Sequence, residues 1–290
     1  MSGGDHFPDA IDDKTLDHLL KIIHDFTGIM MSKKKNSMLQ GRLRPRMRTL
    51  GITSYSEYLS HLEVHPEERQ EFINLVTTNE TYFFRTPRIW EYIEKIVLPE
   101  WITKKNESIF SVWSAAASSG EEAHTLAIVL QKFKEKHPHF QFQIHGTDIS
   151  SEVLSYAIAG IYSGRSIEMF QKNQPELFNR YMKLSSAKNY SVASELHSKI
   201  VFQSYNLFSA PIYKRKFDLV LLRNVLIYFE AKDQEKVLKN VSHTIKHGGT
   251  LIIGEAESLN RLNTDYAYIQ PMIYYLPQDE TRKEAENHHE

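Results

Sequence analysis

Polar side chains follow four apolar runs of the sequence, at the points where each run ends. They are Glu121 and Glu122 after IFSVWSAAASSG, Asp148 after FQFQIHGT, Asn206 after KIVFQSY, and Arg223 with Asn224 after FDLVLL. Apolar runs that alternate with helical patterns are typical of a parallel sheet. In such a sheet, ligands bind beyond the carboxyl ends of the strands, near the point where the strand order reverses. We therefore expect these side chains to line one ligand site.

The turn AAASSGEE indicates which ligand this site prefers. A dinucleotide site needs the glycines of G-x-G-x-x-G so that the backbone can approach a pyrophosphate. This turn has one glycine and two acids, and the acids would repel a pyrophosphate. S-adenosylmethionine fits better, because it has an amino group and a sulfonium, and Asp148 can accept hydrogen bonds from both ribose hydroxyls.

Each of these acids also has an alternative interpretation. Glu121 and Glu122 could simply interact favourably with the amino terminus of a helix. Asp148 could cap the following helix, with Ser150 as the competing cap.

The elements that position these side chains divide the chain into parts. Helical spacing without any strand pattern predicts a helical domain over residues 1–76, followed by a linker over 77–90 that carries TTNETYFFR. Strands and helices then alternate, which predicts a sheet domain over 91–280 and a flexible tail over 281–290. The predicted helices are 11–29, 38–49, 55–62, 67–76, 87–97, the segment after AAASSG, a segment from about 151, and 231–246.

Three segments shape the rest of the expected sheet. KIVFQSYNLF and FDLVLLRNVLIYF are predicted to be buried strands, and TLIIGEAE a further strand. YAYIQPMIYYL has aromatic and β-branched residues with no helix before it, which predicts one added antiparallel edge strand. Residues 161–199 interrupt the alternation, and we expect a small antiparallel β insertion there.

Composition excludes several classes of function. Among 290 residues, 35 are Lys or Arg and 36 are Asp or Glu, so there is no overall basic field to attract nucleic acid. The absence of cysteine excludes disulfides, thiolate metal sites and a cysteine nucleophile. The polar start MSGGDHFPDA does not resemble a signal peptide, and no run of about 18 apolar residues could span a bilayer. We expect a cytosolic protein without direct membrane insertion.

Positive charge is concentrated in one segment, KKKNSMLQGRLRPRMR, which spans residues 33–48 and contains no acid. This segment is either a solvated helix face or a docking surface for an acidic partner. It lacks the aromatic residues on which nucleic-acid bases stack.

Four motifs occur in order along the chain: TTNETYFFR, VWSAAASSGEE, GTDIS and LLRNVLIYF. Together they resemble the motifs of the chemotaxis receptor glutamate methyltransferase (CheR) family, and the resemblance covers nearly the whole chain. It implies an α/β fold with a Rossmann-like S-adenosylmethionine-dependent methyltransferase sheet, an N-terminal helical domain and a small antiparallel β insertion. It also implies methyl esterification of glutamates on the cytoplasmic helical bundle of bacterial chemoreceptors, with S-adenosylhomocysteine as the other product.

The resemblance implies roles for individual residues. Arg85 and Tyr228 would position the substrate without a general base. Phe83 and Phe84 would pack and fix the backbone of TTNETYFFR, the first of the four motifs along the chain and therefore called the opening motif. The predicted docking surface for receptor is formed by Arg42, Arg44, Arg46 and Arg48. The predicted donor contacts are Asn79, Thr81, Arg85, Glu122, Asp148, Asn206, Leu207, Arg223 and Asn224.

Some relatives in this family bind a carboxyl-terminal receptor pentapeptide through a glycine-containing loop in the β insertion. KLSSAKNYSVASELHSK has no glycine, so we expect this chain to act independently of a pentapeptide. Two alternatives remain open: a non-catalytic scaffold that keeps the fold, and a methyltransferase for another protein or a nucleic acid. His137, His139 and His145 span a turn and a strand, a spacing that does not predict a metal site.

Overall fold

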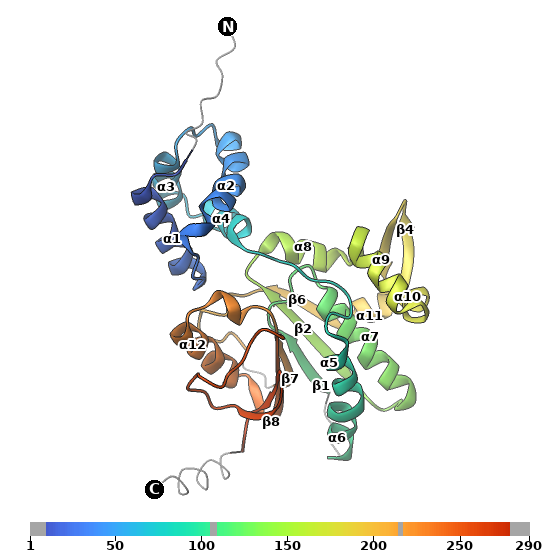
Figure 1. The fold of residues 1–290 in the computed structure, drawn as a ribbon. Coiled ribbons are helices and arrows are strands. Elements are labelled where there is room, and N and C mark those ends of the chain that lie inside the picture. The colour runs from blue at the N-terminus through green and yellow to red at the C-terminus, as the bar shows by residue number, and fades with distance from the viewer. Residues whose placement is uncertain (1–9, 105–108, 214–216, 279–290) are drawn as a thin grey trace, which may run out of the picture.

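The computed structural model describes residues 10–104, 109–213 and 217–278. The predicted tail at 281–290 lies outside these residues. Figure 1 shows a helical body and a larger sheet-containing body, with the chain after α4 running in extended form from one to the other. Each body has its own cluster of buried apolar side chains. No helix within the described ranges has the length and apolarity needed to cross a membrane.

The helical body contains the four helices that the sequence predicts. They are α1 (Asp13–Thr27), α2 (Asn36–Leu50), α3 (Tyr55–Val64) and α4 (Glu68–Val76), with a short 3-10 turn at Lys33–Lys35 before α2. Asp12 caps α1 by accepting from the Thr15 N–H at 2.9 Å. Gly28 ends that helix with a φ of 75°, a conformation that favours glycine. The fully buried Leu19, Leu39 and Phe72 come from different helices and form the core between them.

The larger body is built on a seven-stranded sheet with the order β6-β2-β1-β7-β8-β10-β9. The strands are β1 (Phe110–Ser114), β2 (Phe142–Asp148), β6 (Ile200–Ser204), β7 (Phe217–Leu222), β8 (Ile245–Ile253), β9 (Ala267–Gln270) and β10 (Ile273–Tyr275). The first five strands in this order are parallel, and β10 is antiparallel to β8. The strand order reverses between β1 and β7, so their carboxyl ends are where a ligand is expected.

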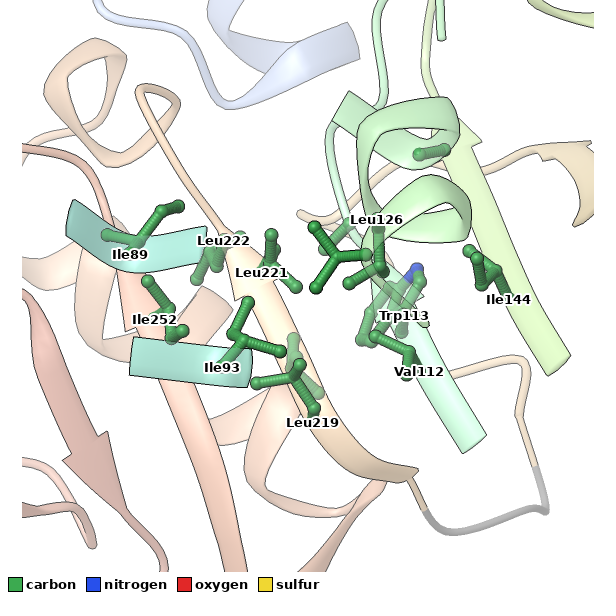
Figure 2. Packing of buried hydrophobic residues seen from close by; sticks show 14 of the residues in the cluster. Ile89, Ile93, Val112, Trp113, Leu126, Ile144, Leu219, Leu221, Leu222 and Ile252 are labelled. Carbon is green, nitrogen blue, oxygen red and sulfur yellow. The ribbon is translucent and has the colours of Figure 1, made fainter. Parts of the chain in front are cut away.

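Helices cover the sheet on both faces. They are α5 (Pro87–Tyr92), a π-helical turn at Ile93–Val97, α6 (Leu98–Thr103), α7 (Glu121–Lys136), α8 (Ser151–Ala159) and α12 (Ala231–Ser242). Figure 2 shows Ile93 near Leu219 and Ile89 near Leu222 and Ile252, while Leu126 lies over Trp113. The predicted helix 87–97 thus continues as a helical segment to Thr103.

The predicted antiparallel insertion is present. It contains a three-stranded sheet with the order β3-β5-β4, made of β3 (Ile161–Tyr162), β4 (Met182–Ser186) and β5 (Asn189–Val192). Three helices that the sequence did not predict accompany it: α9 (Gly164–Asn173), α10 (Pro175–Tyr181) and α11 (Ser194–His197).

The structure corrects four predictions about elements. KIVFQSYNLF was predicted to be a buried strand, but β6 ends at Ser204 and is the outer strand of the sheet, with Val201 47% exposed. FDLVLLRNVLIYF was predicted to be one buried strand, but β7 ends at Leu222, and the chain turns at Asn224, with a φ of 57°, into the 3-10 turn Leu226–Tyr228. YAYIQPMIYYL was predicted to be one edge strand, but it forms the hairpin β9–β10, because Met272 turns the chain with a φ of 72°. The predicted helix 231–246 ends at Ser242, and residues from Ile245 onward join β8.

Candidate active site

A cavity lies at the carboxyl ends of the parallel strands and is lined by residues of both bodies. Thr27, at the end of α1, lines it together with Ile29 and Met30 of the following segment. Val76, at the end of α4, lines it together with residues 77–81 of the extended chain. Every residue predicted to contact donor or position substrate lines this cavity: Asn79, Thr81, Arg85, Glu122, Asp148, Asn206, Leu207, Arg223, Asn224 and Tyr228. Their individual roles stay predictions, but the fold brings them together.

Asp148, the last residue of β2, lies on the floor of this cavity. The backbone N–H of Ser118 donates to its Oδ2 at 2.8 Å, and that of Ser150 donates to its Oδ1 at 3.0 Å. Burial raises the pKa of Asp148, against the effect of these backbone hydrogen bonds. The side chain of Ser150, and not Asp148, accepts from the first turn of α8. Because a carboxylate has about four lone-pair positions, Asp148 keeps acceptor capacity for a ligand diol.

The turn between β1 and α7 brings the backbone close to the cavity. Ser118 has a φ of 50° and Gly120 a φ of 95°. A Cβ at Gly120 would lie 2.8 Å from the Cβ of Ala157, so only glycine fits there without a shift of α8. The Ser118 hydroxyl donates to the Asn79 carbonyl at 3.0 Å, which joins this turn to the opening motif.

Glu122 and Arg223 form a buried ion pair beside the cavity. Arg223 Nη1 donates to Glu122 Oε2 at 2.7 Å, and Ser114 Oγ donates to Glu122 Oε1 at 2.7 Å. Arg223 Nη2 also donates to Thr86 Oγ1 at 2.9 Å and to the Arg85 carbonyl at 3.2 Å. The contacts that Arg223 makes therefore anchor the opening motif to the sheet.

The aromatic residues Phe83 and Phe84 of the opening motif TTNETYFFR are fixed by contacts with the sheet-containing body. Phe83 is buried and stacks on Phe170 at 4.8 Å between ring centroids, which supports the packing interpretation. Phe84 has a φ of 57° and donates its backbone N–H to Thr125 Oγ1 at 3.1 Å. Non-glycine residues with positive φ are uncommon and cluster at functional sites. Arg85, the next residue, lines the cavity and donates to the Glu80 carbonyl at 2.9 Å.

Two predicted asparagines make contacts that shape the cavity. Asn206 Nδ2 donates to the Phe26 carbonyl at 2.8 Å, a hydrogen bond that joins the two bodies. Asn224 has a φ of 57°, and its backbone N–H donates to Glu257 Oε2 at 3.0 Å. Asparagine tolerates this left-handed conformation better than most residues, which gives a structural reason for its presence after β7.

Tyr228, in the 3-10 turn Leu226–Tyr228, also lines the cavity. Partial burial raises the pKa of Tyr228, so its hydroxyl keeps its proton near neutral pH and can donate. Its carbonyl accepts from the Met30 backbone N–H at 2.8 Å. Lys35 Nζ lies 6.0 Å from the centre of the Tyr228 ring and also lines the cavity. The cavity lining therefore combines the Tyr228 hydroxyl with the cations Lys35 and Arg85.

Sequence reasoning missed the residues that the helical body contributes. Met30, Met31 and Lys35 line the cavity, but GIMM reads as the ordinary end of a helix. The Gly28 that precedes them could have been a signal, because a Cβ there would lie 2.6 Å from the Phe208 ring. Sequence reasoning also missed Glu257, which accepts from the backbone N–H of the cavity residue Asn224. Burial raises its pKa, and it accepts from the backbone N–H of Gly254 at 2.5 Å.

The predicted docking arginines already make contacts within the helical body. Arg46 donates through Nη2 to Glu68 Oε2 at 2.5 Å, Arg42 Nη1 donates to the Thr77 carbonyl at 2.7 Å, and Arg44 Nε donates to Tyr55 Oη at 3.1 Å. Arg48 is exposed on the same helix. Their role as a receptor-docking surface stays a prediction.

Within the described ranges, no group of three or more His, Asp or Glu side chains could hold a metal ion. Acids lie after β1 and at the end of β2, beneath a cavity at the point where the strand order reverses. A ligand site at this place on an open α/β sheet, with acids at the ends of the first two strands, is the kind expected of the S-adenosylmethionine-dependent methyltransferase class.

Comparisons with known proteins identify the family. Residues 79–274 match the model "CheR methyltransferase, SAM binding domain", and residues 14–77 match "CheR methyltransferase, all-alpha domain". The chain belongs to the CheR methyltransferase family, and its cofactor is S-adenosylmethionine.

Three relatives show how far the similarity extends. The chemotaxis protein methyltransferase of Borreliella burgdorferi is 32% identical over 267 residues, which cover 89% of this chain and 93% of the relative. Chemotaxis protein methyltransferase 1 of Pseudomonas aeruginosa is 32% identical over 86% of this chain and 92% of its own length. The chemotaxis protein methyltransferase of Salmonella typhimurium is 31% identical over 93% of this chain and 92% of its own length.

Proposed function

We propose that this protein transfers the methyl group of S-adenosylmethionine to glutamate side chains on the cytoplasmic helical bundle of bacterial chemoreceptors, giving glutamyl methyl esters. The observation that supports the proposal is that the cations Arg85 and Lys35 and the Tyr228 hydroxyl line one cavity, where they are available to a carboxylate. Among the described residues that line the cavity, none is a histidine that could serve as a general base. The names of the relatives support a role in chemotaxis.

A carboxylate acceptor suits a site without a general base. A surface glutamate has a pKa of about 4.3, so its oxygen is already a nucleophile near neutral pH. The bound donor supplies an electrophilic methyl group on a sulfonium. What this chain must supply is alignment, and well-oriented reactants can gain about 7–11 kcal/mol in this way.

The residues divide this task between them. Asp148 holds the ribose diol, and the guanidinium of Arg85 orients an anion, either the donor's carboxylate or the incoming glutamate. Tyr228 donates to the acceptor carboxylate. Met30 and Phe229 line the cavity with apolar surface and keep bulk water away from the reacting atoms.

The basic segment Lys33–Arg48 would steer an acidic receptor helix to this cavity. Arg42 and Arg44 would do so from α2 in addition to their contacts within the domain. Steering by exposed charge weakens with ionic strength, because the screening length is about 10 Å at 0.1 M salt. Receptor association should therefore weaken with added salt, and an association that stayed constant would remove this role.

The β insertion leaves little room for a pentapeptide-binding loop. β4 ends at Ser186 and β5 begins at Asn189, so only Ala187 and Lys188 connect them. We propose that the protein acts at receptor arrays in the cytoplasm without binding a receptor carboxyl-terminal pentapeptide. Titration with such a peptide should give no binding isotherm, and saturable binding would contradict this proposal.

The reaction itself is tested by incubating the protein with receptor-containing membranes and a donor labelled on its methyl group. We expect label on the receptor that is released by mild alkali, as a methyl ester requires. Alkali-stable label, or label on nucleic acid or another protein, would replace the acceptor in this proposal. Donor binding without any transfer would favour a non-catalytic scaffold.

A further inference from the structure

A buried polar cluster lies behind the turn between β1 and α7, on the side away from the cavity. Tyr162, at the end of β3 in the insertion, is 6% exposed and donates its hydroxyl to the Ser119 carbonyl at 2.7 Å. His124, on the first turn of α7, is fully buried. Neither residue lines the cavity, and neither has a role in the proposed methyl transfer.

The hydrogen bonds of this cluster fix the position of each proton. Because the Tyr162 hydroxyl has one hydrogen and donates it to Ser119, His124 Nδ1 must donate to the Tyr162 oxygen at 2.9 Å. The same Nδ1 lies 2.9 Å from the Gly120 carbonyl, which can only accept. His124 Nε2 therefore accepts from His197 Nδ1 at 3.2 Å. Burial and the neighbouring His197 lower the pKa of His124 to about 3, in agreement with a neutral imidazole.

A second contact joins the insertion to the same turn. The Ser166 hydroxyl, on α9, donates to Glu121 Oε1 at 3.3 Å, and the Ser119 hydroxyl donates to Glu121 Oε2 at 2.7 Å. Ser119 therefore makes two hydrogen bonds in this cluster: its carbonyl accepts from Tyr162, and its hydroxyl donates to Glu121.

This support bears directly on Asp148. The residue before Ser119 is Ser118, whose N–H donates to Asp148 and whose φ is 50°. A serine does not favour this conformation without help from its surroundings. If the Ser119 carbonyl were not held, Ser118 could relax and its N–H would leave Asp148.

We propose that Tyr162 is a positioning residue for the donor: its hydroxyl holds the Ser118–Gly120 turn in the shape that orients Asp148 toward the ribose. His124 orients that hydroxyl, so the small insertion contributes to donor affinity without touching the donor. The inference rests on the donor site and is independent of which acceptor is methylated.

The test is the substitution Tyr162→Phe, which keeps the ring that packs at 5.0 Å on Phe83 and removes only the hydroxyl. We expect the Kd for S-adenosylhomocysteine and the KM for the donor to rise about fivefold, the effect of one lost hydrogen bond. The kcat at saturating donor should stay within about twofold, because the acceptor contacts are unchanged. The control is Tyr190→Phe, in the paired strand β5 opposite Tyr162, where Tyr190 packs against Phe178.

The outcomes separate positioning from general structure. A rise in donor KM with Tyr162→Phe alone supports the proposal. Unchanged donor affinity overturns it, as does an equal loss in both variants, which would mean that the insertion acts only through stability. If Tyr162→Phe does not fold, Ser166→Ala tests the second contact, with an expected rise in Kd of about twofold, and no rise would contradict the proposal. Absence of binding by the wild-type protein would overturn the donor site itself.

Discussion

Two buried carboxylates, one in each body, are held in opposite ways. In the helical body, Glu68 is 2% exposed and accepts from Arg46 at 2.5 Å and from the Tyr58 hydroxyl at 2.9 Å. In the cleft, Asp148 is 7% exposed and accepts from backbone N–H groups, including those of Ser118 and Ser150.

The pKa shifts of these carboxylates reflect the difference. Burial acts to raise the pKa of Glu68, but the hydrogen bonds from Arg46 and Tyr58 hold it below its ordinary value. Burial raises the pKa of Asp148, and no cation offsets it. Glu68, which is paired with a cation inside the protein, stabilises the fold. Asp148, which keeps acceptor capacity and lines a cavity, is available to a ligand.

Glu122 sharpens the comparison, because it lies at the cleft and yet is paired with a cation. Arg223→Met leaves this carboxylate buried and unpaired, which we expect to lower the free energy of unfolding by about 3–5 kcal/mol. Urea unfolding measures the loss. Arg88→Met is the matched control, because its pair with Glu255 is exposed and should cost less than about 1 kcal/mol. Equal effects of the two substitutions would show that the Glu122 pair does not stabilise the cleft.

Arg85 tests whether the cleft orients an anion by shape as well as by charge. Arg85→Lys keeps the charge but loses the planar, two-pronged donor geometry. We expect turnover at saturating donor to fall about 100-fold, as for the loss of a positioned donor at a reacting oxygen. Initial rates of methyl transfer measure it, with Arg88→Lys as the control. Near wild-type rates would remove Arg85 from the mechanism.

Arg46 tests the role of Glu68, the buried carboxylate of the helical body. Arg46→Met removes the cation from Glu68, and we expect a loss of about 2 kcal/mol in the free energy of unfolding, below the range for a fully buried pair. Part of the Arg46 side chain is exposed, which is the reason for the smaller value. Affinity for S-adenosylhomocysteine should not change. Lys95→Met, in the exposed pair with Glu91, is the control, and a change in donor affinity would contradict the separation of roles.

The smallest expected effect is that Glu68 and Asp148 change the free energy of unfolding with pH in opposite directions. The pKa of Glu68 is lowered, so its stabilising effect is present above its unfolded value of 4.5 and is lost as the pH falls through its folded value. The pKa of Asp148 is raised above 3.8, so its ionisation costs stability at neutral pH, and this cost is relieved as the pH falls.

Unfolding of Glu68→Gln and Asp148→Asn from neutral to acid pH measures both effects. Relative to its variant, the wild type should lose its advantage with acid in the Glu68 case and gain stability in the Asp148 case. The same sign in both series would contradict the comparison.

The sheet side of the site could be predicted from sequence because parallel strands bring their ends to one edge. Asp148, Asn206 and Arg223 each follow an apolar run, and a topological rule is sufficient to bring them together. The helical side could not be predicted in this way. Met30 and Lys35 reach the cavity through packing between the two bodies, and no local pattern marks such contacts.

Two further features show the same limit. The hairpin β9–β10 was read as one strand because the turn at Met272 lies within a run of aromatic and β-branched residues. Tyr162 reaches the donor turn through a contact across 43 positions of sequence, from an element that was expected only as a loosely defined insertion. Residues that act through a neighbour's carbonyl leave no trace in a motif.

The central claim is that the cleft binds the adenosyl donor through Asp148. Titration calorimetry with S-adenosylhomocysteine tests it most directly, using the wild type, Asp148→Ala and, as a control for a buried carboxylate elsewhere, Glu68→Gln. We expect saturable binding by the wild type and by Glu68→Gln, with affinity about 100-fold weaker for Asp148→Ala because two charge-assisted hydrogen bonds are lost. No heat with the folded wild type, or equal affinity for Asp148→Ala, would contradict the claim.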